Sequence, residues 1–155
     1  MKQPTESTYK NIILRTDKIL TRTVYLIYPA LLLFLAVKKE PEIIQALLVP
    51  GISFILVSLF RRLLDAPRPY EVTSREPIIQ RKGKGSSFPS RHTFSTFVIA
   101  VTVFYFWPAA GILTGIAGAA LAAARVLGGV HFVRDVIAGA AIGIGCGVLG
   151  FYVIF

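Results

Sequence analysis

The sequence predicts an all-α fold, a polytopic bundle of about five transmembrane helices with a short amphipathic helix at the N-terminus. Hydrophobic residues make up 54% of the 155 residues and the mean hydropathy is +0.65, whereas soluble domains average about 45–50% apolar residues. The formal net charge is +9, yet almost no charge falls inside the long apolar runs. Glycines also recur at a spacing of four in the last two runs, as close helix packing in lipid requires.

A length of 155 residues fits one domain, which we expect to span residues 1–155. A basic chain can bind nucleic acid, but the apolar content favours anionic lipid or a phosphorylated substrate instead. Cys146 is the single cysteine, which excludes an intrachain disulfide. Because aspartate and histidine are scarce and no cysteines cluster, we expect no structural zinc site. We also expect no cofactor.

The N-terminal segment, residues 1–22, is basic and polar. Residues 9–20 include Ile12, Ile13, Ile19 and Leu20, which lie among Lys10, Arg15, Asp17 and Lys18. This pattern favours a short interfacial amphipathic helix. A basic segment that continues the next helix is an equally good interpretation.

Five apolar segments follow and predict the membrane spans. A spanning helix needs about 17–25 residues, so the first, third and fourth segments are short unless their flanks join them. The third then has to begin at Arg91 and His92. Glycines spaced by four predict close packing at Gly111/Gly115 and at Gly139/Gly143/Gly147. The segments cover residues 23–37, 43–60, 93–107, 109–124 and 136–155.

A polar stretch, residues 65–91, interrupts this pattern and predicts an active-site loop. For residues 71–85, a solvated connector is an equally good interpretation. Three polar clusters border the apolar segments, at residues 61–69, 88–93 and 124–135. If every segment crosses the membrane once, all three clusters lie on one face. Both histidines and most arginines of the chain then share one neighbourhood.

The residue types in these clusters suit phosphate chemistry. Arginine is a planar, permanently charged fork that matches phosphate oxygens, and the candidates are Arg61, Arg68 and Arg125. His131 and Asp135 are four residues apart, so on a helix the carboxylate can hold one ring nitrogen and leave the other as a nucleophile or base.

The second cluster suits an anion and a proton donor. His92 lies at the start of a predicted helix, with Ser90 as its N-cap. Backbone N–H groups at such a helix end favour a bound anion. His92 can then donate a proton to a leaving alkoxide.

Together the clusters resemble the signature of the type 2 phosphatidic acid phosphatase superfamily. That signature reads Lys, six residues, Arg-Pro; then Pro-Ser-Gly-His; then Ser-Arg, five residues, His, three residues, Asp. The order and spacing match from Arg61 onward. Arg61 replaces the usual Lys, Arg91 the usual Gly and Ala124 the usual Ser, and five spans are evident where family members commonly have six.

The resemblance implies a metal-independent phosphatase that acts on lipid phosphate monoesters or diphosphates. His131 would attack phosphorus to form a phosphohistidine, Asp135 would orient it, and His92 would protonate the leaving oxygen. Arg91 is either a substrate contact or a headgroup anchor. The phosphate would be held by Arg61, Arg68, Arg125 and the region of Ser90.

The resemblance leaves several alternatives open. A non-catalytic protein that binds or transports lipid phosphates would need the arginines but not both histidines. Vanadium haloperoxidases share the signature but are soluble. We expect an integral protein of a bacterial plasma membrane with its catalytic face outward, although the positive-inside rule favours the opposite orientation. The sequence indicates neither the exact lipid nor the oligomeric state.

Overall fold

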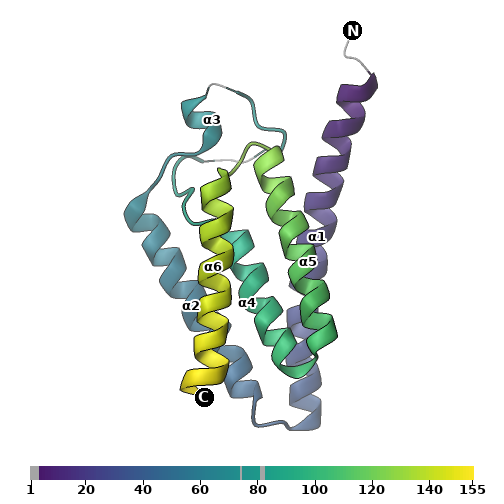
Figure 1. Cartoon of the computed structure of the whole chain (residues 1–155), viewed down its shortest axis with the longest axis vertical. Helices are drawn as coiled ribbons and strands as arrows, with labels where there is room; N and C mark the ends of the chain where they lie inside the picture. The colour runs from purple at the N-terminus through teal and green to yellow at the C-terminus, as the bar shows by residue number, and fades with distance from the viewer. Residues whose placement is uncertain (1–3, 74, 81–82) are drawn as a thin grey trace.

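The computed structural model describes residues 4–73, 75–80 and 83–155. Within these ranges the chain is all α-helical with no β-strand, which confirms the predicted fold class. Residues 81 and 82 of the polar loop lie outside the described part of the chain. The elements are α1 (Pro4–Lys38), α2 (Ile43–Leu64), α3 (Pro69–Val72), α4 (Arg91–Phe106), α5 (Pro108–Leu127), α6 (Val133–Leu149) and the π-helical turn η1 (Gly150–Ile154) (Figure 1).

The N-terminal segment is not a separate amphipathic helix. It forms one continuous helix, α1, with the first apolar segment, and the helix has 35 residues. At 1.5 Å per residue its length is about 52 Å, which exceeds the hydrocarbon thickness of about 30 Å. The prediction of a separate helix was therefore wrong, and the alternative of a continuing helix is correct. The physical reason is that no glycine or proline interrupts the chain between Pro4 and Pro29.

The five apolar segments all form helices, but they differ in how they could cross a membrane. Four helical stretches are long and apolar enough to span. Helix α4 has only 16 residues and, as predicted, begins at Arg91. It lies inside the bundle, where it buries Phe94, Val98 and Val103 almost completely. The four spanning stretches are Glu6–Lys38, Ile43–Val72, Pro108–Leu127 and Val133–Ile154.

Glycines of α6 allow this helix to approach α4 closely. A Cβ atom on Gly139 would lie 2.6 Å from the Ser90 carbonyl oxygen, and one on Gly143 would lie 2.6 Å from the Phe94 carbonyl oxygen. These contacts confirm the packing predicted for the α6 glycines. The Gly111/Gly115 pair behaves differently, because Gly111 packs on Phe104 while a Cβ on Gly115 would meet nothing within 4 Å.

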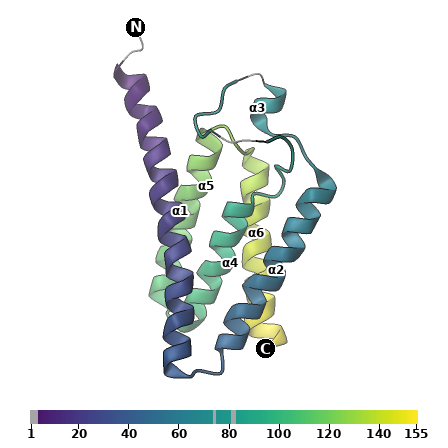
Figure 2. The same cartoon turned by 180° about the vertical axis from the view of Figure 1, so that it is seen from behind.

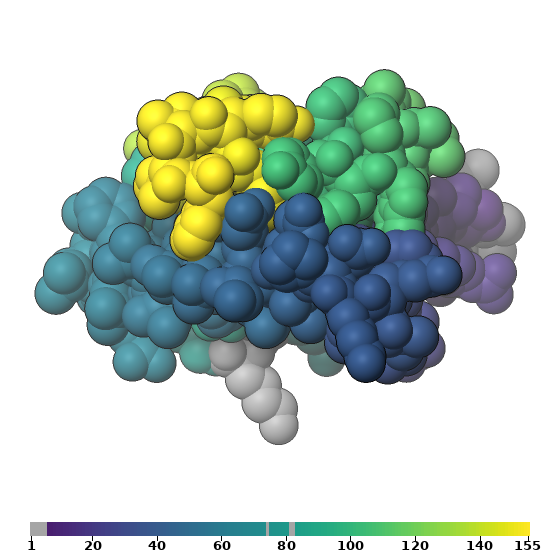
Figure 3. Space-filling model, turned by 90° about the horizontal axis from the view of Figure 1, so that it is seen from below, coloured from purple at the N-terminus to yellow at the C-terminus, as the bar shows by residue number. Residues whose placement is uncertain are grey.

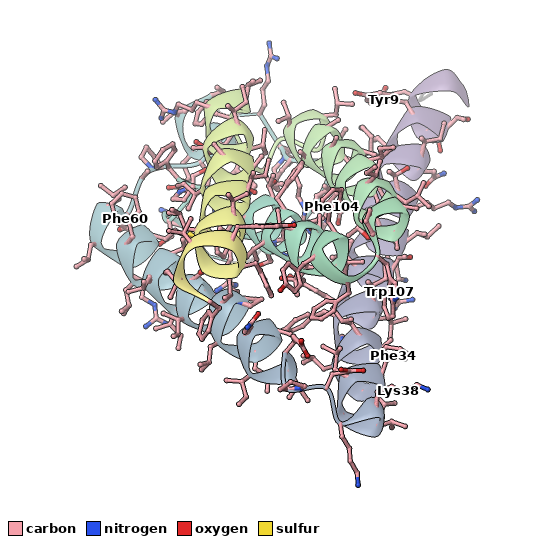
Figure 4. All side chains as sticks on the ribbon, turned by 60° about the horizontal axis from the view of Figure 1, so that its bottom comes forward. Tyr9, Phe34, Lys38, Phe60, Phe104 and Trp107 are labelled. Atoms are coloured by element: carbon pink, nitrogen blue, oxygen red, sulfur yellow. The ribbon has the colours of Figure 1, made fainter. Side chains whose placement is uncertain are left out.

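The two ends of the bundle have different characters. One end carries the short α1–α2 and α4–α5 connections and the C-terminus (Figure 3). Here Trp107 ends α4, and its ring packs edge-on against Phe34 of α1 at a centroid distance of 4.9 Å (Figure 4). The other end carries α3, the polar loop, the start of α4 and the α5–α6 connection (Figure 1). The three polar clusters therefore lie at one end, as the topology predicts.

Candidate active site

Two buried arginines shape the polar loop. Arg61 and Arg68 are 4% and 1% exposed. Arg61 donates Nη1–H to the Ser87 carbonyl oxygen at 3.2 Å and Nη2–H to the Ser86 carbonyl oxygen. Arg68 donates Nε–H to the Gly85 carbonyl oxygen at 3.0 Å and Nη2–H to the Ser86 carbonyl oxygen at 3.1 Å. Because backbone carbonyls fix both guanidinium groups, the charges and the loop position each other.

Arg68 also joins the first cluster to the third. Its Nη1–H donates to the Val130 carbonyl oxygen at 2.9 Å, immediately before His131. Glu71 also holds the loop, because its carboxylate accepts the Gly85 backbone N–H at 2.8 Å. Gly85 has φ +67°, and a Cβ there would lie 2.1 Å from the Asp65 Oδ1 atom. A side chain at this turn would therefore displace Asp65 and disturb the loop.

The predicted pair of His131 and Asp135 forms, but not as two residues on one helix face. His131 lies in the connection before α6, whereas Asp135 lies in its first turn. The His131 Nδ1 atom is 3.4 Å from Asp135 Oδ2. The same Oδ2 atom accepts the Ser87 hydroxyl at 2.5 Å and the Phe132 backbone N–H at 3.0 Å. The carboxylate thus orients His131 while two other donors hold the carboxylate.

The environment of His131 favours a neutral imidazole. Its side chain is 1% exposed, and burial lowers the His131 pKa to about 4 although the hydrogen bond that the ring donates to Asp135 acts in the opposite direction. The positive charges of Arg68 and Arg61 lower this pKa further. At neutral pH the ring therefore keeps a lone pair, and because Nδ1 faces Asp135 that lone pair belongs to Nε2.

The second cluster touches the third through Ser90. The Ser90 backbone N–H donates to the Asp135 carbonyl oxygen at 2.8 Å. Ser90 occupies the N-cap position of α4 as predicted, but it forms no side-chain cap hydrogen bond. Its hydroxyl instead accepts the Thr93 hydroxyl at 3.0 Å. His92 follows two residues later, at the start of α4.

His92 and Arg91 pack against the first two helices. The half-buried His92 ring lies 6.2 Å from the Tyr25 ring of α1, with an interplanar angle of 37°. The Arg91 guanidinium lies 5.6 Å from the centroid of the Phe54 ring of α2, which is a cation–π distance. These contacts place the second cluster beside α1 and α2.

Arg125, in the last turn of α5, contacts α1 as well. Its Nε atom is 2.6 Å from Asp17 Oδ1, and its Nη2 atom donates to the Thr21 hydroxyl at 3.4 Å. The predicted site residues other than Ser90, together with Ser87, therefore fall into two groups. We call Arg61, Arg68, Ser87, His131 and Asp135 the loop cluster. We call Arg91, His92 and Arg125 the helix cluster.

Ser87 and three residues of α1 contact the site through their side chains but were not singled out from the sequence as site residues. Ser87 directly precedes the second cluster, and this position in the sequence is the signal that could have identified it as a site residue. Asp17 is the single acidic residue between Glu6 and Glu40, which marks it as unusual in a basic segment. Thr21 and Tyr25 follow at spacings of four, on the same face of α1.

The sequence of residues 42–155 matches the PAP2 superfamily. This region includes all three polar clusters and more than half of the chain. The chain belongs to the PAP2 superfamily. Within this PAP2 protein, α1 lies outside the matched region, although it supplies the partners of Arg125 and His92.

Two solved structures share the fold of this PAP2 protein. The crystal structure of Aquifex aeolicus LpxE superposes with a TM-score of 0.74 and 22% sequence identity, covering 96% of this chain and 87% of that one. The crystal structure of a transmembrane PAP2-type phosphatidylglycerolphosphate phosphatase from Bacillus subtilis gives a TM-score of 0.65 and 24% identity, covering 97% and 77%. At these identities the likeness shows the fold alone. No curated protein sequence matches the chain significantly.

Proposed function

We propose that this PAP2 protein is a membrane enzyme that hydrolyses lipid phosphate monoesters or diphosphates through a phosphohistidine on His131. One observation carries the proposal. A buried, neutral imidazole has its Nδ1 atom facing the Asp135 carboxylate at 3.4 Å, beside two buried arginines. This is the arrangement of an activated nucleophile with an orienting carboxylate and cations that attract an anion.

In the first step, the Nε2 lone pair of His131 attacks phosphorus. The bond between phosphorus and the leaving oxygen breaks, and the protonated ring of His92 donates a proton to that oxygen. The Asp135 carboxylate stabilises the positive charge that develops on His131. The products of this step are a phosphohistidine and the leaving group, which is the lipid alcohol from a monoester or the lipid monophosphate from a diphosphate.

In the second step, water attacks the phosphohistidine. His92, now neutral, accepts a proton from the water as the oxygen–phosphorus bond forms. The nitrogen–phosphorus bond breaks and returns the electron pair to His131. Inorganic phosphate then leaves the site.

We assign the stabilisation of the phosphoryl oxygens to Arg61, Arg68 and Arg125, to the Ser90 region at the start of α4, and to Arg91 as a candidate contact. The guanidinium charges of Arg61 and Arg68 act on His131, so they also act on a phosphoryl group bound to it. The free N–H groups of a helix start favour the same anion. Preorganised positive charge of this kind is the largest contribution in phosphoryl transfer.

An apolar cavity supports a substrate with a hydrocarbon tail. It has a volume of about 230 Å³ and lies between α1, α2 and α4. Its wall includes Tyr25, the ring neighbour of His92, and Phe54, the ring neighbour of Arg91. A lipid chain bound there would present its phosphate to the helix cluster. The remaining lining residues are Tyr28, Pro50, Gly51, Ser95, Val98 and Ile99.

The decisive experiment measures phosphate release by the purified protein in detergent–lipid micelles. We expect turnover of phosphatidic acid, phosphatidylglycerophosphate or undecaprenyl diphosphate, and we expect His131→Ala to abolish it. In the described ranges of the chain, no three His, Cys, Asp or Glu side chains are grouped to hold a metal ion. We therefore expect full activity in EDTA. Strict metal dependence would contradict the phosphohistidine route.

The intermediate can be trapped directly. Substrate labelled with ³²P should label the wild-type chain in an acid-labile, base-stable form, as expected for a nitrogen–phosphorus bond. The label should be absent from His131→Ala and should persist longer in His92→Ala, because the second step then lacks its base. Equal labelling of wild type and His131→Ala would place the intermediate elsewhere or exclude it.

We further propose a bacterial plasma membrane location with the catalytic end facing outward. The start of α1, at Pro4, lies at the same end of the bundle as α3 (Figure 1). A tag at the N-terminus therefore reports the side of the site. Labelling of the tag in intact cells by an impermeant reagent supports the outward orientation, and labelling only after lysis overturns it.

A further inference from the structure

One face of α1 contacts the site although α1 lies outside the region that matches the family. Asp17, Thr21 and Tyr25 are spaced by four residues and so lie on successive turns of one helix face. Asp17 and Thr21 contact Arg125, and Tyr25 contacts the His92 ring. Figure 2 shows α1 running beside α5 along this side of the bundle.

The contact between Asp17 and Arg125 has the features of a fixed ion pair. The Asp17 Oδ1 atom is 2.6 Å from the Arg125 Nε atom, and the two side chains are 15% and 8% exposed. Exposed ion pairs contribute little, but removing one partner of a largely buried pair leaves an uncompensated charge. The Thr21 hydroxyl, 3.4 Å from Nη2, lies against the same guanidinium.

The Arg125 side chain has several rotatable bonds, and ordering such a side chain costs conformational entropy. A guanidinium that is already oriented before substrate binds avoids that cost during binding. The loop cluster orients Arg61 and Arg68 through backbone carbonyls. Arg125 instead has its partners on another helix.

We infer that Asp17 is a positioning residue, which together with Thr21 holds the Arg125 guanidinium in the orientation that binds the substrate phosphate. This inference rests on the proposed function. It makes α1 a part of the phosphate site rather than only a membrane anchor. Asp17 acts through Arg125 and does not touch the substrate.

The test compares Asp17→Asn with Asp17→Glu, using phosphatidic acid in detergent micelles as substrate and inorganic phosphate as competitive inhibitor. We expect Asp17→Asn to raise both the KM for phosphatidic acid and the inhibition constant for phosphate about tenfold, which corresponds to about 1.4 kcal/mol. We expect kcat to fall less. Asp17→Glu keeps the charge and should recover part of the affinity. A merely structural role would reduce the folded fraction without changing either constant.

Two further variants make the result specific. In an Arg125→Ala background, adding Asp17→Asn should have no further effect, because the two residues act as one unit. Glu6→Gln is the matched control, since Glu6 forms an exposed ion pair with Lys10 at 2.7 Å on the same helix. We expect that control to retain wild-type constants.

Several outcomes overturn the inference: wild-type constants in Asp17→Asn, a gain in phosphate affinity, or additive losses with Arg125→Ala. A gain would mean that Asp17 competes with phosphate for Arg125. A wild-type protein that releases no phosphate from any lipid overturns the proposed function instead. Inorganic phosphate binding, measured by isothermal titration on wild type and Asp17→Asn, then decides the Asp17 inference separately.

Discussion

The loop cluster and the helix cluster are organised in opposite ways. In the loop cluster, Arg61 and Arg68 donate to backbone carbonyls, and Asp135 accepts from a serine hydroxyl and a backbone N–H. In the helix cluster, Arg125 pairs with Asp17, and His92 lies beside Tyr25. One half of the site is therefore held by hydrogen bonds that involve the polar loop and the start of α6. The other half is held by side-chain contacts between helices.

This difference separates two requirements of the proposed reaction. The nucleophile needs one fixed tautomer and one fixed direction, which Asp135 provides while the Ser87 hydroxyl and the Phe132 backbone N–H hold its carboxylate. The residues that meet the incoming headgroup have to admit a bulky lipid from the bilayer, which contacts between helices allow. The predictions below test this division, beginning with the change that should cost most.

Replacing the orienting carboxylate should give the largest loss. In Asp135→Asn, the amide can donate to Nδ1 of His131 and thereby move the ring proton to Nε2, which removes the nucleophilic lone pair. We expect kcat to fall about 10²–10⁴-fold, with little change in KM, measured by phosphate release. Arg134→Gln is the control, because Arg134 is 67% exposed and its Nε atom lies 3.6 Å from Asp135. Comparable losses in both variants would argue against a specific role of Asp135.

Arg68→Lys keeps the charge but removes the planar fork. A lysine ammonium cannot reach the Gly85, Ser86 and Val130 carbonyl oxygens together, so buried acceptors lose their donors. We expect stability to fall by about 3 kcal/mol and kcat/KM to fall about 10²-fold, measured by thermal unfolding in detergent and by initial rates. Arg62→Lys, at an exposed neighbouring position, should change neither. A stable Arg68→Lys protein with normal activity would show that the loop does not need the fork.

Ser87→Ala should have a smaller effect. The variant loses the hydroxyl that donates to Asp135 Oδ2 at 2.5 Å, while the backbone carbonyl that accepts from Arg61 remains. A hydrogen bond to a charged group contributes about 1.5 kcal/mol, so we expect kcat to fall about tenfold. Ser86→Ala is matched, because the Ser86 hydroxyl contacts Asp65 at an exposed position. If both variants keep wild-type rates, Ser87 does not help to orient the carboxylate.

A change of pH should have the smallest effect on kcat/KM. Because the His131 pKa is lowered to about 4, the nucleophile stays neutral from pH 7 down to about pH 5, and this group should change kcat/KM less than about twofold in that range. The stability of the folded protein depends on pH in a different way. The unfolded chain binds a proton below its pKa of about 6.5 whereas the folded chain does not, so stability falls as the pH drops from 6.5 towards 4.

His131→Ala separates these two effects, since it should unfold with a weaker dependence on pH in that window. Thermal unfolding between pH 4 and 7 measures how stability depends on pH, and pH–rate profiles measure how kcat/KM depends on pH. An acid limb of kcat/KM near pH 6.5 that belongs to His131 would contradict the lowered pKa and the buried environment that causes it.

The sequence predicts the helices of this protein better than the contacts of its site. The apolar runs and the glycines at 139, 143 and 147 follow directly from membrane physics. The start of α4 at Arg91 was also expected, although α4 has only 16 residues and is shorter than a span requires. His131 was expected on a helix because it lies four residues from Asp135, yet the pair forms across a helix start. Spacing alone cannot distinguish these two geometries.

The loop and α1 were harder to predict for another reason. The donors of Arg68 meet backbone carbonyls, and every residue has a carbonyl, so no residue type signals this contact. Ser87 carries no periodic pattern that would distinguish it from Ser86. Asp17 is separated from Arg125 by more than a hundred residues, and only the three-dimensional packing of α1 on α5 brings the two together.

The short length of α4 determines how far inside the bundle the proposed reaction would take place. Helices α4 and α5 share the turn at Trp107, but α4 has 16 residues and α5 has 20. At 1.5 Å per residue, α4 therefore begins about 6 Å short of the end of α5, and Figure 1 shows its start below the tops of α5 and α6. A phosphate that reaches His92 has to enter the bundle below the ends of α5 and α6, and it loses much of its hydration water there. The attraction of the arginines for that phosphate grows as water is excluded.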